Sequence, residues 1–356
     1  MKINHNNYLK LAFNIAKINL GKTNSNPSVG CVVVKDNSVI SSGYTSINGR
    51  PHAEFNALNS RRNFNNSDLY VTMEPCTHYG VTPPCTNIIA NKGIKRVFYS
   101  FNDTDKRTAK MSKVKLGKKK IKVYKRFNAN FKDFYQSYFL IKKNTIPFLD
   151  AKIAVSKDYF TINKKYRWIT NSKSRDRAHL IRSEYDAIVS TSKSINKDNS
   201  MLNCRLNGLN NNKPDLVIID LKLKIKKNLN IFNENSKRKI LIVTSVLMTK
   251  KISYFKKKGI KIILIKSLKT KNDFINLFNI LKKYGYNRIL IESGLIFLQK
   301  LIKDNLIFNL YMFQSCTRLG KSGKNNISSS FIKKLKLKKR LNVNLNGEKI
   351  FKIKIR

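Results

Sequence analysis

The sequence predicts an α/β protein built from two domains, and three observations support this. The chain has 356 residues, more than the roughly 100 to 200 of an ordinary domain. Short apolar strand patterns alternate with helical patterns, as in a layered α/β sheet. The alternation breaks at Lys142-Lys143-Asn144 and restarts at Pro147, so we expect domains over 1–144 and 145–356.

The first domain is predicted to start with a helix and a hairpin. Apolar residues recur at helical spacing over 8–20, and two short strands at 31–34 and 38–40 flank a turn at 36–37. Pro51 suits the first turn of a helix that runs to residue 58. The rest of this domain is predicted as a strand at 69–72, a helix from 84 or 85 to 93, strands at 96–99 and 121–124, and a helix to about 141.

The second domain repeats the alternation of strands and helices, without an internal sequence repeat. The predicted elements are a strand at 148–155, a helix at 172–183, strands at 186–190, 215–220, 239–244 and 260–265, a helix at 272–283 and a strand at 287–292.

The composition is that of a folded protein outside the membrane. Hydrophobic residues make up 41% of the chain, no apolar run approaches the ~20 residues that span a bilayer, and the polar start lacks a secretory signal. We therefore expect a cytoplasmic protein without membrane contact.

The net charge of +52 is unusual, and such a surface would attract polyanions. Lys and Arg are spread over the whole chain, however, which favours a general composition bias over a nucleic-acid-binding surface.

The cysteines indicate a reducing compartment. Their number, five, is odd, and two of them lie in a pattern that metal binding explains better than disulfide pairing. The other three, Cys31, Cys204 and Cys316, lie in or near apolar stretches and are predicted to be small buried thiols.

One histidine and two cysteines form a candidate zinc site. His52 opens a helix, and Cys76 and Cys85 each follow a proline. One imidazole and two thiolates leave the fourth tetrahedral position open for water, as catalytic zinc requires. His78 lies between the cysteines and is an alternative ligand.

Glu54, two residues after His52, is the candidate proton carrier. It can reach the water at the metal without binding the metal, and can pass protons to a ring nitrogen and to leaving ammonia. The prolines before Cys76 and Cys85 favour helix starts, where amide dipoles lower the pKa of a thiol. The cysteines lie nine residues apart, so the short deaminase signature P-C-x-x-C is not met.

Three motifs resemble a known family, the bifunctional riboflavin-biosynthesis proteins, in which a pyrimidine deaminase is fused to a ribosyl reductase. The matching stretches are 26–31 (NPSVGC), 51–54 (PHAE) and 70–85 (YVTMEPCTHYGVTPPC). The nine-residue cysteine separation is the spacing of that family. The resemblance implies a cytidine-deaminase-like α/β/α domain followed by a dihydrofolate-reductase-like α/β domain.

The resemblance also implies two activities and two cofactors. With Zn²⁺, the first domain would deaminate 2,5-diamino-6-(5-phosphoribosylamino)pyrimidin-4(3H)-one. With NADPH, the second would reduce the ribosyl group to ribityl. Asn26 and Asp103 would line the first pocket. In the second domain, the resemblance assigns Lys152, Trp168, Ser194, Asp198 and Gly294 to the cofactor, and Arg182, Leu202, Arg205 and Glu292 to the substrate.

The sequence departs from the family pattern at several positions. Val81 stands where a basic residue is usual, Thr45 where a histidine is usual, and residues 104–106 read Thr-Asp-Lys in place of Pro-Asn-Pro. In the second half, Tyr166, Leu221 and Asn199-Ser200 also differ from the pattern. These changes leave the predicted metal ligands intact and weaken the expected binding of the phosphate-bearing part of the substrate.

Three alternatives remain open from the sequence: a deaminase with a degenerate reductase domain, a deaminase acting on nucleic-acid bases, and a zinc-stabilised binding protein without activity. The second domain of some 200 residues argues against a nucleic-acid deaminase. The expected partner is a small phosphoribosyl pyrimidine, and a homo-oligomer is left open.

Overall fold

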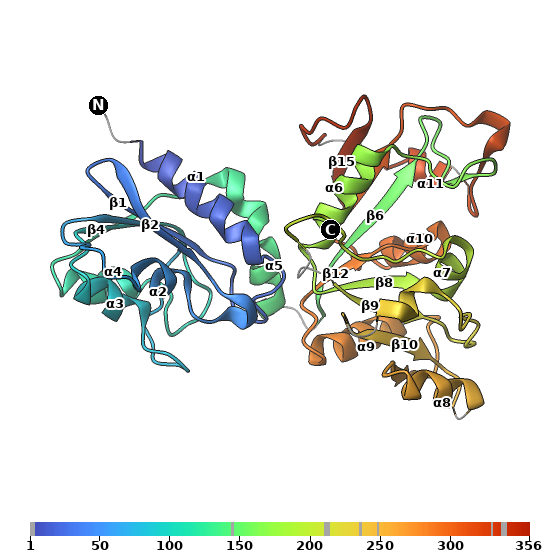
Figure 1. The fold of residues 1–356 in the computed structure, drawn as a ribbon, viewed down its shortest axis with the longest axis horizontal. Helices are drawn as coiled ribbons and strands as arrows, with labels where there is room; N and C mark the ends of the chain where they lie inside the picture. The colour runs from blue at the N-terminus through green and yellow to red at the C-terminus, as the bar shows by residue number, and fades with distance from the viewer. Residues whose placement is uncertain are drawn as a thin grey trace. The chain divides into compact units, whose positions relative to one another are not determined.

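The computed structural model describes residues 4–143, 146–209, 214–234, 237–247, 249–328, 330–335 and 340–356. The chain forms two compact units, Met1–Asn144 and Thr145–Arg356 (Figure 1). Asn144 and Thr145, beside the predicted boundary, lie outside the described residues.

The first unit contains one five-stranded sheet in the order β2-β1-β3-β4-β5. Strand β1 pairs antiparallel with both neighbours, whereas β3, β4 and β5 run parallel. The strands are β1 (Gly30–Lys35), β2 (Ser38–Tyr44), β3 (Asp68–Met73), β4 (Arg96–Phe101) and β5 (Lys122–Lys125). Because β3 is buried along its whole length, the predicted metal-binding motif that follows it starts from a well-packed element.

Helices cover both faces of this sheet. They are α1 (His5–Ala16), α2 (Ala53–Leu58), α3 (Cys85–Asn91), α4 (Ser112–Gly117) and α5 (Lys132–Lys143), with short 3-10 turns η1 (Lys17–Asn19), η2 (Ile47–Gly49) and η3 (Ala129–Phe131). Side chains that alternate along the strands form separate cores on the two faces. The unit therefore has three layers.

Two glycines allow the helices to lie close to the sheet. A Cβ atom on Gly30 would lie 1.9 Å from the carbonyl oxygen of Ala12 in α1. A Cβ atom on Gly43 would lie 2.4 Å from the backbone nitrogen of Ala57 in α2. Both contacts are with backbone, which cannot move aside as a side chain can. Close packing at Gly43 fixes α2, the helix that carries the predicted catalytic residues.

The second unit is built on an eight-stranded sheet in the order β11-β10-β9-β8-β12-β6-β13-β15. All neighbours are parallel except β13 and β15. The strands are β6 (Phe148–Val155), β8 (Ala187–Thr191), β9 (Asp215–Ile219), β10 (Ile240–Thr244), β11 (Lys261–Leu264), β12 (Arg288–Ile291), β13 (Asn309–Gln314) and β15 (Lys349–Lys354). A separate two-stranded sheet joins β7 (Ile162–Asn163) and β14 (Gly323–Lys324).

Helices pack on both faces of the large sheet, and each face has its own apolar core. One core includes apolar side chains of α9 and α10, and the other includes those of α6 and α8. The helices are α6 (Ser172–Arg182), α7 (Ser192–Asp198), α8 (Lys250–Lys257), α9 (Lys271–Lys283), α10 (Leu295–Lys303) and α11 (Ser330–Lys333), with 3-10 turns η4 (Asn230–Glu234) and η5 (Gly320–Ser322).

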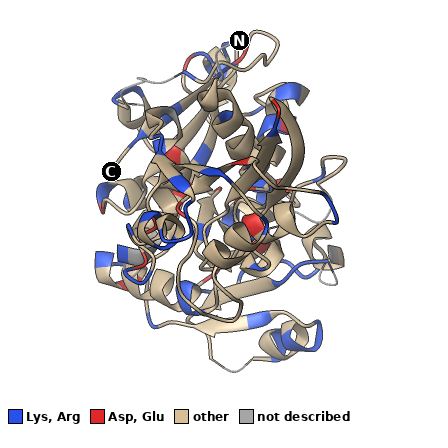
Figure 2. Cartoon of the chain, turned by 90° about the vertical axis from the view of Figure 1, so that its left-hand side faces the viewer, with Lys and Arg blue, Asp and Glu red and all other residues tan. Residues whose placement is uncertain are grey.

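The α/β architecture predicted from the sequence is the one observed, and each predicted strand and helix has a counterpart. The prediction that Cys316 is buried is wrong: this thiol is exposed because it follows the end of β13, whereas Cys31 and Cys204 are buried. Lys and Arg positions are spread over helices, strands and loops (Figure 2). Among the described residues, no helix is both long and apolar enough to cross a bilayer.

Candidate functional site

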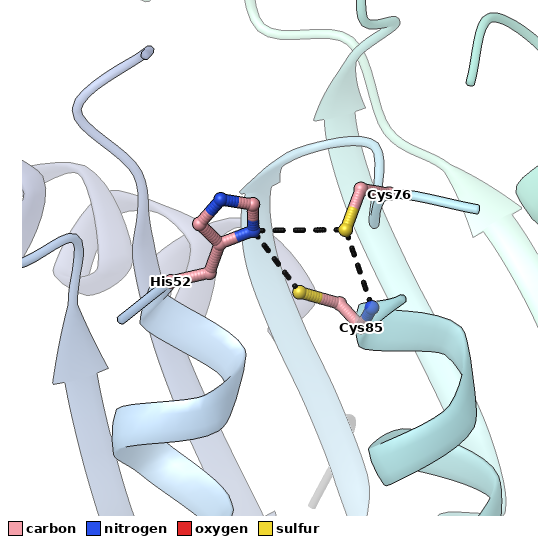
Figure 3. A group of neighbouring side chains, drawn as sticks. All are labelled: His52, Cys76 and Cys85. Carbon is pink, nitrogen blue, oxygen red and sulfur yellow. Dashed lines mark hydrogen bonds between the residues drawn. The ribbon is translucent and has the colours of Figure 1, made fainter. Parts of the chain in front are cut away.

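Three side chains of the first unit converge after β3. His52 is the residue before α2, Cys76 follows β3, and Cys85 is the first residue of α3. Nδ1 of His52 lies 3.3 Å from Sγ of Cys85 and 3.6 Å from Sγ of Cys76 (Figure 3). The three ligand atoms all lie within 4.8 Å of one another. The fold thus brings together the three residues that the sequence predicts as metal ligands.

The spacing of these atoms fits a zinc ion. Zinc binds sulfur at about 2.3 Å and nitrogen at about 2.0 to 2.1 Å, so ligand atoms of a tetrahedral site lie roughly 3.5 to 3.8 Å apart. Both distances from Nδ1 of His52 agree with this value to within a few tenths of an ångström. One imidazole and two thiols are also a donor set that leaves a fourth position open. Among the described residues, no other group of His, Cys, Asp or Glu has such an arrangement.

The two cysteines differ in acidity. The prediction that a helix start lowers the pKa of both thiols is wrong for Cys85, because its hydrogen bond with Cys76 and its burial raise the pKa of Cys85. Cys85 opens α3, as predicted, but Cys76 does not begin a helix, so that part of the prediction is wrong. Its sulfur instead accepts the backbone N–H of Cys85 at 3.2 Å. Hydrogen bonding from Cys85 and His52 outweighs burial and lowers the pKa of Cys76 to about 4. A thiolate is therefore favoured at Cys76, and zinc binds thiolates.

His52 has an extended backbone, with φ −72° and ψ 161°, and α2 starts only at Ala53. The prediction that Pro51 occupies the first turn is therefore wrong by two residues. The physical reason is that His52 is the N-cap, the residue with non-helical angles that precedes the first turn. This position places His52 before α2 and Glu54 within its first turn.

Glu54 is almost completely buried, with 4% of its surface exposed. Burial raises the pKa of Glu54 to about 7, and the nearby Cys76 thiolate contributes to the shift. A carboxyl group with such a pKa exchanges protons readily at neutral pH. Both its position and its acidity suit the proton-carrying role predicted for it.

A cavity of about 190 Å³ lies in front of these residues. His52, Glu54 and Cys76 line it, and so do Asn26 and Asp103, the two residues assigned to this pocket by resemblance. The other lining residues are Ser25, Pro27, Val29, Thr45, Arg50, Met73, Glu74, His78, Asp105, Arg107 and Tyr138.

Asn26 and Asp103 are held in place by neighbouring groups. The side-chain amide of Asn26 donates to the carbonyl oxygen of Gly49 at 3.0 Å. Asp103 accepts hydrogen bonds from the Tyr138 hydroxyl at 2.8 Å and from the backbone N–H of Asp105 at 3.0 Å. Each keeps further polar atoms with which it could contact a bound ring.

The alternative metal ligand, His78, lies outside the cluster. Its Nδ1 is 3.0 Å from the hydroxyl of Thr108, although the residue does line the cavity. Of the departures from the family pattern, Thr45 is buried in the lining, where its hydroxyl accepts the N–H of Val29 at 2.9 Å. Val81 is 87% exposed and is not part of the lining.

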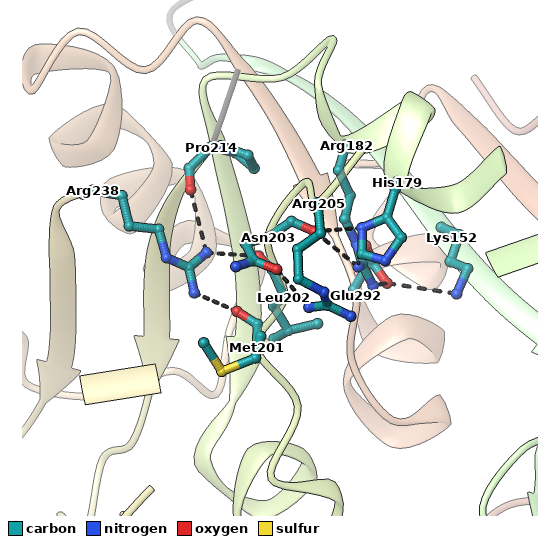
Figure 4. A network of polar contacts seen from close by, with 10 residues as sticks. All are labelled: Lys152, His179, Arg182, Met201, Leu202, Asn203, Arg205, Pro214, Arg238 and Glu292. Atoms are coloured by element: carbon teal, nitrogen blue, oxygen red, sulfur yellow. Dashed lines mark hydrogen bonds and ion pairs between the residues drawn. The ribbon is translucent and has the colours of Figure 1, made fainter. Parts of the chain in front are cut away.

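In the second unit, Glu292 lies between two cations (Figure 4). It follows β12, and its carboxylate accepts two hydrogen bonds from Arg182, the last residue of α6, at 2.5 and 2.9 Å. Nζ of Lys152, on the interior strand β6, lies 3.6 Å away. Burial would raise the pKa of Glu292, but Arg182 and Lys152 outweigh it and lower that pKa to about 2. Glu292 is therefore ionised within the fold, whereas burial lowers the pKa of Lys152 despite the nearby carboxylate.

The loop after α7 lies beside this cluster (Figure 4). The carbonyl oxygen of Asn203 accepts from Nη1 of Arg182 at 3.1 Å, and its side-chain oxygen accepts from Nη1 of Arg205 at 2.6 Å. Leu202 is buried and has a positive φ of 48°, and its carbonyl oxygen accepts from Arg238 at 2.7 Å. Three of the four residues assigned to the substrate are thus linked by hydrogen bonds. Arg182 contacts Glu292 directly and is linked to Arg205 through Asn203.

The residues assigned to the cofactor do not form one network but lie in separate small groups of contacts. The backbone N–H of Gly294, the N-cap of α10, donates to the hydroxyl of Ser194 at 3.1 Å. Trp168 is 52% exposed, and the guanidinium of Arg167 lies 4.8 Å from its ring centroid. The same guanidinium donates to the carbonyl oxygen of Asp198 at 2.9 Å. Arg167 therefore connects two of the assigned residues.

Sequence reasoning did not identify several of these residues. Four of them belong to no motif: Arg50, Tyr138, Asn203 and Arg167. The hydrogen bonds cited for Arg50, Tyr138 and Arg167 join residues that are 31 to 35 positions apart in the sequence. Only the fold brings such distant residues together. The position of Arg50 directly before the P-H-A-E motif is the one local signal that could have identified one of them.

Two family profiles match the chain. One, described as the RibD C-terminal domain, matches residues 147–346, and the other, described as the cytidine and deoxycytidylate deaminase zinc-binding region, matches residues 2–101. These matches confirm the predicted fold class, a deaminase-like domain followed by a dihydrofolate-reductase-like domain.

Individual relatives match over most of their length. Riboflavin biosynthesis protein RibD of Aquifex aeolicus is 30% identical over 311 residues, which cover 86% of this chain and 85% of that protein. RibD of Escherichia coli is 27% identical and covers 88% of each chain. A Thermotoga maritima structure, named a diaminohydroxyphosphoribosylaminopyrimidine deaminase/5-amino-6-(5-phosphoribosylamino)uracil reductase, has a TM-score of 0.82 at 25% identity over 99% of each chain.

Proposed function

The chain belongs to the RibD family of riboflavin-biosynthesis proteins, and from this premise we propose that its two domains catalyse successive steps. The first hydrolytically deaminates 2,5-diamino-6-(5-phosphoribosylamino)pyrimidin-4(3H)-one. The second reduces the ribosyl group of the product to ribityl with NADPH. The observation that carries the proposal is the cluster of His52, Cys76 and Cys85 beside the buried carboxyl of Glu54.

In the first domain, His52, Cys76 and Cys85 hold Zn²⁺, which when bound polarises the attacking water. Glu54 takes a proton from this water and delivers protons to the ring nitrogen and to the leaving amino group. The oxygen of the water becomes the ring carbonyl oxygen, and the amino group leaves as ammonia. A pKa of about 7 supports this role, because Glu54 can then both accept and donate a proton at neutral pH.

In the second domain, NADPH when bound supplies a hydride, and the reduced sugar also takes up one proton. Arg182, Arg205 and Glu292 contact the polar substrate, with the Leu202 backbone beside them. The cofactor contacts are assigned to Lys152, Trp168, Ser194, Asp198 and Gly294. Gly294 supports this assignment because it is the N-cap of α10, where free backbone N–H groups can bind a pyrophosphate.

A single assay with two readouts tests the proposal. The phosphoribosyl diaminopyrimidinone is supplied with and without NADPH, and ammonia and nicotinamide oxidation are followed separately. We expect ammonia in both cases and nicotinamide oxidation when the deaminated product accumulates. Ammonia without oxidation would show that the second domain does not reduce, and no ammonia would refute the proposal for the first domain.

We assign the enzyme to the cytoplasm, with a small molecule as its partner. All five cysteines are free thiols, which fits a reducing compartment. Fractionation of cells followed by the ammonia assay tests this assignment. Activity in the exported fraction would contradict it.

A further inference from the structure

Arg50 lies at the wall of the first-domain cavity, two residues before His52. Its backbone is extended, with φ −148° and ψ 146°, and its side chain is partly buried. No motif assigns a role to this residue. Its position places a permanent positive charge beside the reaction centre, because a guanidinium stays protonated in proteins.

The guanidinium of Arg50 is fixed against the loop that precedes Cys85. Its Nη1 donates a hydrogen bond to the hydroxyl of Thr82. Its Nη2 lies over Gly80, where an added Cβ atom would be only 3.3 Å away. Thr82 is an uncharged partner, so the contact positions the guanidinium without neutralising it. The absence of a side chain at Gly80 leaves room for the arginine.

The other charged groups of the lining mostly have partners. Arg107 forms two hydrogen bonds with the Asp105 carboxylate, at 2.9 and 2.6 Å. The Glu74 carboxylate accepts the backbone N–H groups of Lys110 and Ser112. In the part of the chain that the structure describes, no carboxylate lies within 4.0 Å of the Arg50 guanidinium. Arg50 is thus a positioned cation whose charge is available to a ligand.

We propose that Arg50 binds the phosphate group of the substrate in the deaminase pocket and thereby sets the preference for a phosphorylated pyrimidine. The inference rests on the proposed function, which supplies a substrate with a phosphate arm. An arginine suits this role because its planar guanidinium donates two parallel hydrogen bonds to phosphate oxygens. Thr82 holds one edge of the group and leaves Nη2 and Nε for the ligand.

The test compares ammonia release from the phosphorylated substrate and from its phosphate-free counterpart. For Arg50→Ala we expect KM for the phosphorylated substrate to rise about 10- to 100-fold, the range for losing hydrogen bonds to a charged group. KM for the phosphate-free compound should stay within about twofold, and kcat should change less than KM. Inorganic phosphate should also inhibit the variant more weakly than the wild type.

Controls separate a binding role from a structural one. Arg61→Ala removes an exposed arginine of the same domain that does not line the cavity, and it should change neither KM. If Arg50→Ala does not retain zinc, Arg50→Lys is used in its place. Lysine keeps the positive charge but lacks the planar guanidinium that donates two parallel hydrogen bonds. It should raise KM for the phosphorylated substrate selectively, by a smaller factor.

Equal effects on both substrates, or no effect on either, would overturn the inference. A wild-type enzyme that releases ammonia from neither compound would instead refute the proposed function. The two failures are therefore distinguishable: the second is seen in the wild-type enzyme itself, whereas the first is seen only when the variant is compared with the wild type.

Discussion

Glu54 is a carboxyl group whose acidity depends on burial. It is 4% exposed in the first turn of α2, and its pKa is raised to about 7, so it can carry protons that an exposed glutamate would not. Its sequence position beside His52 was enough to predict the role. Its burial was not visible in the sequence, because it depends on the packing of residues from several elements.

Glu54→Gln should lower the rate of ammonia release by roughly 10²- to 10⁴-fold and leave zinc bound. Glutamine matches glutamate in shape but cannot carry a proton, so the contribution of general acid–base catalysis is lost. Turnover and metal content of the purified variant check this together. Turnover equal to that of the wild type would show that Glu54 does not move protons and would favour a zinc-stabilised binding protein.

Glu292 should contribute stability that disappears in acid. Its pKa is lowered to about 2 by Arg182 and Lys152, which outweigh burial, so the ionised form is favoured by folding. A carboxyl group whose pKa is lower in the folded than in the unfolded protein stabilises the fold at pH values above its unfolded pKa of about 4.5. This contribution is lost as the pH falls toward 2. Glu292→Gln should lower the free energy of unfolding at pH 7 by about 3 kcal/mol, because two buried cations lose their partner.

Denaturant unfolding of both proteins between pH 7 and pH 2.5 measures this effect. The difference between wild type and Glu292→Gln should be constant down to about pH 4.5 and shrink below it. A difference that does not depend on pH would mean that folding leaves the pKa of Glu292 unchanged, which would contradict the predicted shift.

At the scale of helices and strands, most of the first domain could be predicted because its apolar patterns are regular. The strand predicted at 148–155 in the second domain also has the bounds of β6. Helix α4 was missed because its six residues include three lysines or glycines and few apolar positions. The start of α2 was predicted two residues early, since a proline before a helix does not by itself fix the N-cap.

The site could be predicted only where its residues share a motif. His52, Cys76 and Cys85 belong to short sequence motifs, and the structure brings them together. Arg50 contacts Thr82 across 32 positions, a pairing that no local pattern encodes. The same holds for Asp103 and Tyr138, which are 35 residues apart.

Gly30→Ala should destabilise the first domain through the contact of β1 with α1. The new Cβ atom would lie 1.9 Å from a backbone oxygen of α1, so helix or strand must shift. Overpacking of this kind costs about 1–3 kcal/mol. Gly117→Ala is the matched control, because nothing lies within 4 Å of its Cβ position. Thermal unfolding of both variants checks the prediction, and equal midpoints would contradict the close approach.

On the scale of the whole molecule, we assign the two activities to separate compact units, Met1–Asn144 and Thr145–Arg356. The residues assigned to deamination lie in the first unit, and those assigned to reduction lie in the second. Each unit has its own apolar cores. We therefore expect the two reactions to be separable in the intact chain.

A chelator should stop ammonia release without stopping reduction. Removing zinc should disable only the first unit, because the three proposed metal ligands all belong to it. Supplied with the deaminated intermediate and NADPH, the chelated protein should oxidise NADPH at a rate within about twofold of the untreated protein, and added zinc should restore ammonia release. Loss of both reactions on chelation would show that the units depend on one another.

The central claim is that His52, Cys76 and Cys85 hold one zinc ion at the deamination site. Elemental analysis combined with X-ray absorption spectroscopy of the purified full chain tests it most directly. The account predicts one zinc per chain with two sulfur ligands and at least one nitrogen ligand, and loss of that zinc in Cys85→Ser. A chain that holds no stoichiometric zinc while it still releases ammonia, or a zinc without sulfur ligands, would contradict it.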